Sequence, residues 1–275
     1  LGIKGEDNPE VMEGVSFLRE INMGRKVNLG ERVAVIGGGN VAFDVSRSAL
    51  RLGAREVTII YRRTRDEMPA SKEEIEEALH EGVKFEYLVA PTKIESKGGA
   101  AKLTCVRMEL GEVDSSGRRR PVPVKGSEFS LVFDNVISAI GQTPEAPEQF
   151  GLPLSKRNTF QVERYTLATS REGVFACGDS VTGPATVIEA IAAGRQVAIS
   201  IDKYLGGDGV IDETLASEEV GVLTELEEGE HPGISIPTLS LSDRLGNFAE
   251  VELSLKEEVA VKEARRCLRC DLEDD

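Results

Sequence analysis

Short apolar runs alternate with helical patterns along the first third of the chain. The runs at residues 32–37, 56–61 and 83–88 are rich in β-branched and aromatic residues, which is typical of strands. Between them, residues 40–52 and 71–80 place apolar side chains at helical spacing, and a glycine closely follows each segment. The order strand, helix, strand, helix, strand predicts a βαβ unit built on a parallel sheet.

The pattern changes in residues 92–133. Three short β-rich runs are separated by turn-forming glycines and serines, at residues 102–110, 121–124 and 128–133. This pattern predicts an antiparallel β meander appended to the βαβ unit. A further buried strand is expected at residues 135–140.

The other segments are more scattered. Residues 9–23 predict an amphipathic helix, and residues 186–205 predict a long helix that follows a short buried strand at residues 174–178. Residues 206–230 are typical of a linker, and a last helix is expected within residues 251–270.

Composition adds information mainly through charge. The 275 residues are 40% hydrophobic and 29% charged, which is ordinary for a globular chain of one or two domains. No apolar run approaches the ~20 residues of a membrane span. The net charge is −15, of which −13 falls in residues 206–275, and this sign disfavours nucleic acid and anionic membranes as partners. The acidic end is either a solvated surface or linker, or a segment that binds a basic partner.

A glycine-rich motif lies where the first predicted strand meets the first helix of the βαβ unit. It has the form G-x-G-x-x-A, in the setting of a dinucleotide-binding turn. Gly37 permits a tight turn, and Gly39 lets a pyrophosphate approach the backbone. Ala42 lets the helix and the strand pack closely. The N-terminus of the helix presents N–H groups to the phosphates. The alternative is a glycine-rich turn that binds nothing. The candidate residues are Gly37, Gly38, Gly39, Asn40, Val41 and Ala42.

The tip of the second strand indicates which dinucleotide would bind. An NAD site needs Asp or Glu there for the ribose 2′-hydroxyl. This strand ends instead in Tyr61, Arg62 and Arg63, and guanidinium groups suit a 2′-phosphate, which each can bind in bidentate fashion. The sequence therefore predicts NADP(H), with the alternative that the two arginines only solvate the end of a strand.

Four short sequence segments, which occur here in the same order as in a known family, give the chain a resemblance to that family. They match pyridine-nucleotide-dependent flavoprotein oxidoreductases of the glutamate synthase small-subunit (β-subunit) type, over about residues 1–205. Residues 231–270, which end in Arg-Cys-Leu-Arg-Cys, also resemble the tail of some members. The matching residues are 33–42, 61–63 with 68–70, 139–144, and 175–179 with 186–190.

The resemblance implies an α/β fold of the two-dinucleotide-binding-domain type. In this fold a Rossmann-like NADPH domain with an antiparallel meander is inserted into an FAD-binding domain. Residues 1–27 would be a connector and helix of a partial FAD domain, and residues 28–138 the NAD(P)H domain. Residues 139–205 would be the C-terminal part of the FAD domain, and residues 206–275 an acidic linker and tail.

The resemblance also implies contacts with the two cofactors. Asp179, next to Gly178, would bind the ribityl or pyrophosphate region of FAD. The backbone at Thr186 and Val187 would meet the pyrimidine edge of the flavin, and Gly141 would lie near the nicotinamide.

Glu74 has two compatible interpretations. By resemblance it matches a carboxylate that meets the nicotinamide carboxamide in related reductases. From its spacing it is the N3 residue of an S-x-x-E capping box that begins at Ser71.

The sequence departs from the family upstream of the NADPH motif. The FAD domain of the family opens with its own strand and glycine-rich turn, and the 36 residues before Gly37 contain no such motif. The chain is therefore expected to be a C-terminal fragment of a longer enzyme, or to receive the missing N-terminal FAD half from a partner chain.

The four cysteines divide into two kinds. Cys105 and Cys177 stand alone and are expected to be small buried residues, which argues against dithiol chemistry. Cys267 and Cys270 form a C-x-x-C pair suited to a metal or cluster. Three interpretations stay open: half of a 4Fe–4S site completed by residues outside this chain, half of a zinc site, or an idle pair.

Together these features predict a cytoplasmic, NADPH-dependent flavoprotein oxidoreductase. NADPH would reduce FAD, and electrons would leave through iron–sulfur clusters to a partner subunit. The cofactors carry this chemistry, so no catalytic side chain is predicted. One alternative is an NADPH-binding or assembly module that is inactive alone because its FAD site is incomplete. Another is a standalone Rossmann dehydrogenase, which would need a Tyr/Lys or His dyad near the nicotinamide.

Overall fold

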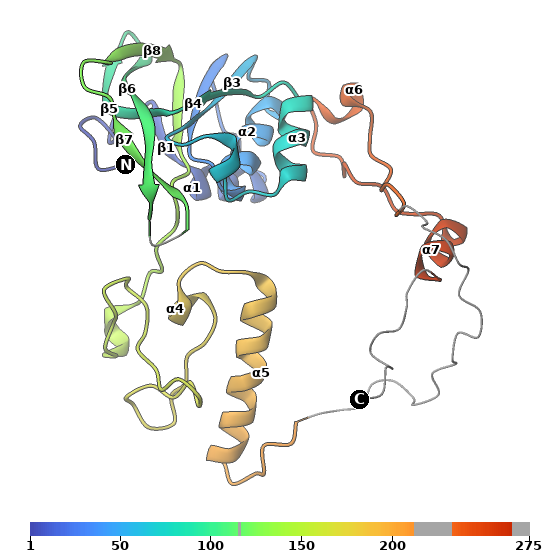
Figure 1. Cartoon of the computed structure of the whole chain (residues 1–275). Coiled ribbons are helices and arrows are strands. Elements are labelled where there is room, and N and C mark those ends of the chain that lie inside the picture. Colours follow the sequence, from blue (N-terminus) through green and yellow to red (C-terminus); the bar gives the residue numbers. More distant parts are fainter. Residues whose placement is uncertain (115–116, 212–232, 266–275) are drawn as a thin grey trace. The chain divides into compact units, whose positions relative to one another are not determined.

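The computed structural model describes residues 1–114, 117–211 and 233–265 (Figure 1). The chain divides into two compact units. The first contains residues 1–141 together with residues 226–275, and the second contains residues 142–225.

A five-stranded parallel sheet forms the centre of the first unit (Figure 1). Its strands are, in spatial order, β1 (Val11–Glu13), β9 (Asn135–Ser138), β2 (Arg32–Ile36), β3 (Glu56–Tyr61) and β4 (Lys84–Tyr87). All neighbours pair in parallel. The strands expected after the N-terminal helix, from residue 32 to residue 140, are confirmed with only small shifts at their ends.

Helices pack on one face of this sheet. They are α1 (Gly14–Asn22), α2 (Asn40–Arg51) and α3 (Lys72–His80). Phe43 of α2 and Ile75 of α3 share a buried core with Val35 and Ile59 of the sheet. Burial of these apolar side chains supplies the main driving force for this layer.

An antiparallel sheet packs on the other face. It contains β5 (Val89–Lys97), β6 (Ala100–Val113), β7 (Arg119–Pro123) and β8 (Phe129–Phe133), and β6 pairs with each of the others. Its Leu103 and Phe133 share a second core with Ile36 and Ile60 of the parallel sheet. The expected meander is confirmed, with β5 as an additional strand.

The N-terminal helix begins later than residue 9, the start expected from its apolar spacing. Val11–Glu13 pairs with β9 as an edge strand, and α1 begins at Gly14. The Glu13 carboxylate caps this helix by accepting hydrogen bonds from the N–H groups of Val15 (3.0 Å) and Ser16 (2.6 Å). Pairing with the sheet edge therefore overrides the local helical pattern, as tertiary contacts often do.

The second unit contains two helices, α4 (Asp179–Thr182) and α5 (Val187–Tyr204), and a 3₁₀ turn at Glu148–Phe150. The long helix expected at residues 186–205 is confirmed. The strand expected at residues 174–178 is wrong: Phe175 forms only an isolated bridge with Ala168. A strand needs a ladder of neighbours, and the described part of this unit contains no extended β-ladder.

The C-terminal segment of the first unit has two short helices, α6 (Leu241–Arg244) and α7 (Glu257–Ala264). The helix expected within residues 251–270 is thus shorter than predicted as far as the chain is described. Cys267 and Cys270 lie outside the described residues, as does most of the predicted linker. None of the helices in the described ranges combines the length and apolar character needed to cross a membrane.

Candidate dinucleotide-binding site

A cavity of about 490 Å³ opens at the carboxyl ends of β2, β3 and β9. In open α/β sheets, ligands bind at this edge of the strands. Side chains and backbone from the end of β3, the start of β5 and the β6–β7 hairpin complete the wall. Most of the NADPH-site residues predicted from the sequence line it: Gly37, Gly38, Gly39, Asn40, Val41, Arg62, Arg63 and Gly141.

The glycine-rich turn shows why side chains are absent there. Gly37 has φ +151°, and a Cβ on it would lie 2.2 Å from the carbonyl oxygen of Ala139. A Cβ on Gly38 would lie 2.6 Å from the ring of Tyr61. At Gly39 the nearest atom would be in Pro69, at 3.6 Å, so this position faces open space as a pyrophosphate-binding glycine must.

The N-terminus of α2 faces the same cavity. Its N-cap is Gly39, and no side chain caps the first turn. Asn40 and Val41, the first two residues of the helix, line the cavity wall. Uncapped N–H groups and the positive end of the helix dipole together favour an anion at this point. Ala42 is fully buried beneath the turn, in the close-packing position predicted for it.

The two predicted arginines differ in environment. Arg62 is exposed and lines the cavity. Arg63 also lines the cavity but is buried: its Nη2 lies 2.7 Å from Oδ2 of Asp114, and its Nε donates to the carbonyl of Arg119 at 2.7 Å. Arg63 is therefore held by the β6–β7 hairpin, whereas Arg62 is open to a ligand.

A third arginine, Arg118, lines the cavity from the β6–β7 hairpin. Arg118 could not be predicted from the sequence, because nothing in the spacing of residues 118–120 shows that a hairpin 55 residues beyond Arg63 returns to the tip of β3. Among the described residues that line the cavity, every charged side chain is an arginine. The wall thus suits a phosphate better than a bare ribose hydroxyl.

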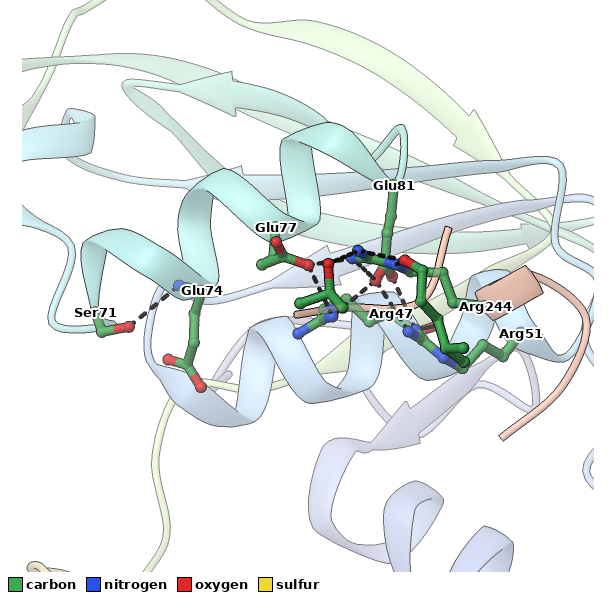
Figure 2. Close-up of polar contacts among 9 residues, drawn as sticks. Arg47, Arg51, Ser71, Glu74, Glu77, Glu81 and Arg244 are labelled. Atoms are coloured by element: carbon green, nitrogen blue, oxygen red, sulfur yellow. Dashed lines mark hydrogen bonds and ion pairs between the residues drawn. The ribbon is translucent and has the colours of Figure 1, made fainter. Parts of the chain in front are cut away.

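One of the two hydrogen bonds of the capping box expected at Ser71 and Glu74 is present. The N–H of Glu74 donates to Oγ of Ser71 at 3.1 Å, at the start of α3 (Figure 2). Its carboxylate does not complete the box: Oε2 is buried and has no hydrogen-bond partner among the described residues. Glu74 does not line the cavity. A buried carboxylate oxygen without a donor is costly, so this group is ready to accept a hydrogen bond.

The residues expected to face FAD lie in the second unit within residues 178–187, which include α4 and the start of α5. Gly178, at φ +63°, precedes α4, and Oδ1 of Asp179 accepts a hydrogen bond from the N–H of Ala185 at 3.2 Å. Thr186 caps α5, and its N–H and hydroxyl both donate to Glu189, at 2.9 and 2.7 Å. The T-x-x-E spacing of residues 186–189 is the sequence signal of this capping box.

The first turn of α5 is capped, but it exposes an apolar side chain. The backbone N–H of Thr186 is engaged by Glu189, while the next residue, Val187, is 76% exposed. This segment therefore brings together the four residues that the resemblance named around the flavin: Gly178, Asp179, Thr186 and Val187. Their roles toward the cofactor stay a prediction.

Residues 1–194 match the family model described as pyridine nucleotide-disulphide oxidoreductase. The chain belongs to this family. It is 46% identical, over 98% of its length, to the NADP(+)-dependent formate dehydrogenase subunit beta of Moorella thermoacetica, and covers 40% of that protein. It is 38% identical, over 98% of its length, to the NADPH-Fe(3+) oxidoreductase subunit beta of Geobacter sulfurreducens, and covers 46% of it.

A third relative carries the resemblance seen in the sequence. The glutamate synthase [NADPH] small chain of Azospirillum brasilense is 40% identical over 64% of this chain, and the match covers 37% of that relative. The expected resemblance is thereby confirmed. The chain spans less than half the length of these three relatives.

Solved structures confirm the expected fold of the two-dinucleotide-binding flavoprotein type. FprA of Mycobacterium tuberculosis in complex with NADPH aligns with a TM-score of 0.62 at 21% identity, over 75% of this chain and 61% of that one. Thioredoxin reductase of T. acidophilum aligns with a TM-score of 0.53 at 21% identity, over 74% and 61%. The expected cofactors, NADP(H) and FAD, are those of this oxidoreductase family.

The two described cysteines of this family member are both free. Cys105 is fully buried in the second core, and burial raises the pKa of its thiol to about 12. Cys177 is only half-buried, in contrast to the expectation that both would be buried. Within the described ranges, no group of three or more His, Cys, Asp or Glu side chains is placed to hold a metal ion.

A buried ion cluster lies at the C-terminal end of α3 (Figure 2), and none of its residues lines the cavity. The fully buried carboxylate of Glu81 accepts hydrogen bonds from Arg47 and Arg51, at 2.7 and 2.8 Å, and Arg244 lies 3.5 Å away. Arg244 also contacts Glu77. Burial acts to raise the pKa of Glu81, but the hydrogen bonds from Arg47 and Arg51 hold it below its usual value. The cluster joins the C-terminal segment to α2 and α3.

Proposed function

We propose that this chain is the NADPH-binding part of a flavoprotein oxidoreductase. The observation that carries the proposal is the cavity at the carboxyl ends of β2 and β3, where an uncapped helix N-terminus and a wall whose charged side chains are arginines come together. The pyrophosphate would bind at the N-terminus of α2, and Arg62 would bind the 2′-phosphate of the ribose. Gly141, across the cavity, would lie near the nicotinamide.

Glu74 would orient the nicotinamide through its carboxamide. Glu74 is in the first turn of α3, five residues after Pro69, which lines the cavity, and this closeness along the chain supports the role. FAD, when bound, would supply the hydride-accepting chemistry of the reaction. Asp179 with Gly178 would hold its ribityl or pyrophosphate region, and the backbone at Thr186 and Val187 would meet the flavin edge.

Onward electron transfer would involve a partner subunit and iron–sulfur clusters. Two of the relatives are named as beta subunits, which supports a partner. Cys267 and Cys270 would contribute half of a 4Fe–4S site. In this proposal residues 28–138 are the NADPH domain, residues 139–205 belong to the FAD domain, and the protein works in the cytoplasm.

A second candidate function is NADPH binding without flavin turnover by this chain alone. The exposure of α5 favours it: Val187, Ile188 and Ile191, in its first two turns, are all more than 60% exposed. An apolar face that the described residues of its own unit leave exposed is typical of a surface that other protein covers.

The nucleotide preference is tested by calorimetric titration of the full chain with NADP⁺ and NAD⁺. We expect wild type to prefer NADP⁺, and Arg62→Ala to weaken NADP⁺ by more than about tenfold while sparing NAD⁺, because charge-assisted hydrogen bonds to phosphate contribute about 1.5–3 kcal/mol. Arg65→Ala is the matched control, since Arg65 pairs with Glu76 and does not line the cavity. Equal losses for both nucleotides in the Arg62 variant would sink the assignment.

An anaerobic visible absorption spectrum of the purified chain, recorded before and after FAD is added, separates the two candidates. A flavin band that bleaches with NADPH supports the oxidoreductase function for the chain itself. A chain that binds NADP⁺ but stays colourless supports the second candidate.

A further inference from the structure

We propose that Arg118 is a further specificity-determining residue of the dinucleotide site. It would bind the ribose 2′-phosphate together with Arg62, while Arg63 acts as a positioning residue that holds the β6–β7 hairpin in place. The inference deepens the proposed function and rests on it.

Arg63 fixes the hairpin to the tip of β3. It bonds to both sides of the hairpin: to the carboxylate of Asp114 and to the backbone carbonyl of Arg119, each at 2.7 Å. The Arg63 side chain is 5% exposed and that of Asp114 is 27% exposed, so the arginine end of this contact is buried. A buried, hydrogen-bonded arginine of this kind holds geometry more firmly than a surface pair does.

Backbone hydrogen bonds connect described residues of the hairpin next to that anchor. The N–H of Asp114 donates to the carbonyl of Arg118 at 2.8 Å, and the N–H of Gly117 donates to the carbonyl of Asp114 at 3.0 Å. The backbone of Arg118 is therefore tied to the residue that Arg63 binds. Arg63 thereby determines where Arg118 lies.

The three consecutive arginines of the hairpin have different environments. Arg118 is half-buried and lines the cavity. Arg119 folds back on its own hairpin and donates to the carbonyls of Leu110 (3.1 Å) and Gly111 (3.2 Å). Arg120 is exposed and does not line the cavity. Of these three, only Arg118 lines the cavity, and Arg120 is a matched control.

The charges in the cavity support a second arginine as a ligand of the same phosphate. The Asp114 carboxylate offsets the charge of Arg63, so Arg63 alone adds little to the field in the cavity. A phosphate monoester carries about −1.5 to −2 charges at pH 7, and two guanidinium groups match it better than one. Arg62 from β3 and Arg118 from the hairpin provide such a pair on two different elements.

The test compares two small probes on the full chain. Isothermal titration with 2′,5′-ADP and with 5′-AMP gives an affinity ratio that isolates the 2′-phosphate. We expect Arg118→Ala to lower this ratio at least about tenfold with 5′-AMP binding unchanged, Arg118→Lys to restore part of it, and Arg120→Ala to leave it unchanged.

The positioning role of Arg63 is tested through its partner. Asp114→Asn should lower the same ratio, and it should lower it much less when Arg118 is already alanine, because both changes remove one interaction. Fully additive effects of the two changes would overturn the positioning role. Circular dichroism and thermal melting show whether each variant is folded, and Arg118→Gln replaces the alanine variant if needed.

The outcomes separate the inference from the function on which it rests. A wild-type ratio retained by Arg118→Ala but lost by Arg62→Ala overturns the role of Arg118 and leaves the proposed function standing. A wild-type chain that binds both probes equally overturns the NADPH preference itself, and the role of Arg118 with it.

Discussion

The two compact units bury their apolar residues to different degrees. In the first unit both faces of the parallel sheet are covered, and Val33, Val35 and Ile59 are fully buried. In the second unit the long helix α5 exposes a row of apolar side chains, with Ile188 74% exposed. The described residues of the first unit therefore build a closed core beside the dinucleotide site, whereas those of the second unit leave the apolar row of α5 exposed. An uncovered apolar face of this kind is typical of a surface that another protein segment covers.

Among the substitutions that test this comparison, we expect the largest loss of stability at the buried ion cluster of the first unit. Glu81→Gln removes a fully buried charge that the nearly buried Arg51 and the partly exposed Arg47 share. We expect a loss of about 3–5 kcal/mol in the free energy of unfolding, measured by urea denaturation at pH 7, because buried arginines would lose their counter-charge. Glu77→Gln, at a partly exposed carboxylate of the same cluster, should cost about 1 kcal/mol or less.

The pH dependence of the stability difference between wild type and Glu81→Gln tests whether the carboxylate charge of Glu81 is its source. The pKa of Glu81 is lowered in the folded chain, so its contribution is complete above the unfolded pKa of about 4.3 and is lost as the pH falls through the lower folded value. The stability difference between wild type and Glu81→Gln should therefore shrink in acid. A difference that stays constant down to about pH 3 would show that the carboxylate charge is not its source.

A matched pair of isoleucines compares the two units directly. Ile59→Ala opens a cavity in the closed core and should cost about 2–5 kcal/mol. Ile188→Ala changes an exposed side chain of α5 and should stay within about 0.5 kcal/mol. Urea denaturation, with hydrogen exchange to assign each transition to a unit, provides the measurement. Similar losses in both variants would mean that α5 is covered in solution.

The same contrast explains how far the sequence could predict the fold. The parallel sheet followed from apolar runs such as that of β2, whose residues are buried on both faces, so burial and sequence pattern agree. Two elements did not follow from their patterns. β1 is three residues long and exists because β9 lies beside it. β5 carries charged residues on its exposed side, which weakens its apolar signal.

The candidate site was predictable where it depends on neighbours along the chain. The glycine-rich turn and Arg62 belong to a single βαβ unit, and the structure places them on one cavity. The ion pair of Arg63 with Asp114 joins residues 51 positions apart, and the position of Arg118 depends on it. No local pattern encodes which hairpin folds over the tip of a strand, so this part of the site required the structure.

Thiol labelling gives the smallest perturbation and tests the same contrast without altering a core. Cys105 lies in the closed core of the first unit, where burial raises its pKa to about 12, while Cys177 of the second unit is half-buried. In a chain carrying Cys267→Ser and Cys270→Ser, we expect a disulfide reagent at pH 8 to modify Cys177 readily and Cys105 only under unfolding conditions, since the thiolate is the reacting form. Removing Cys177 as well should leave a chain whose labelling rate follows the opening of the first unit. Rapid labelling of Cys105 in the folded chain would contradict the closed core on which the comparison of the two units rests.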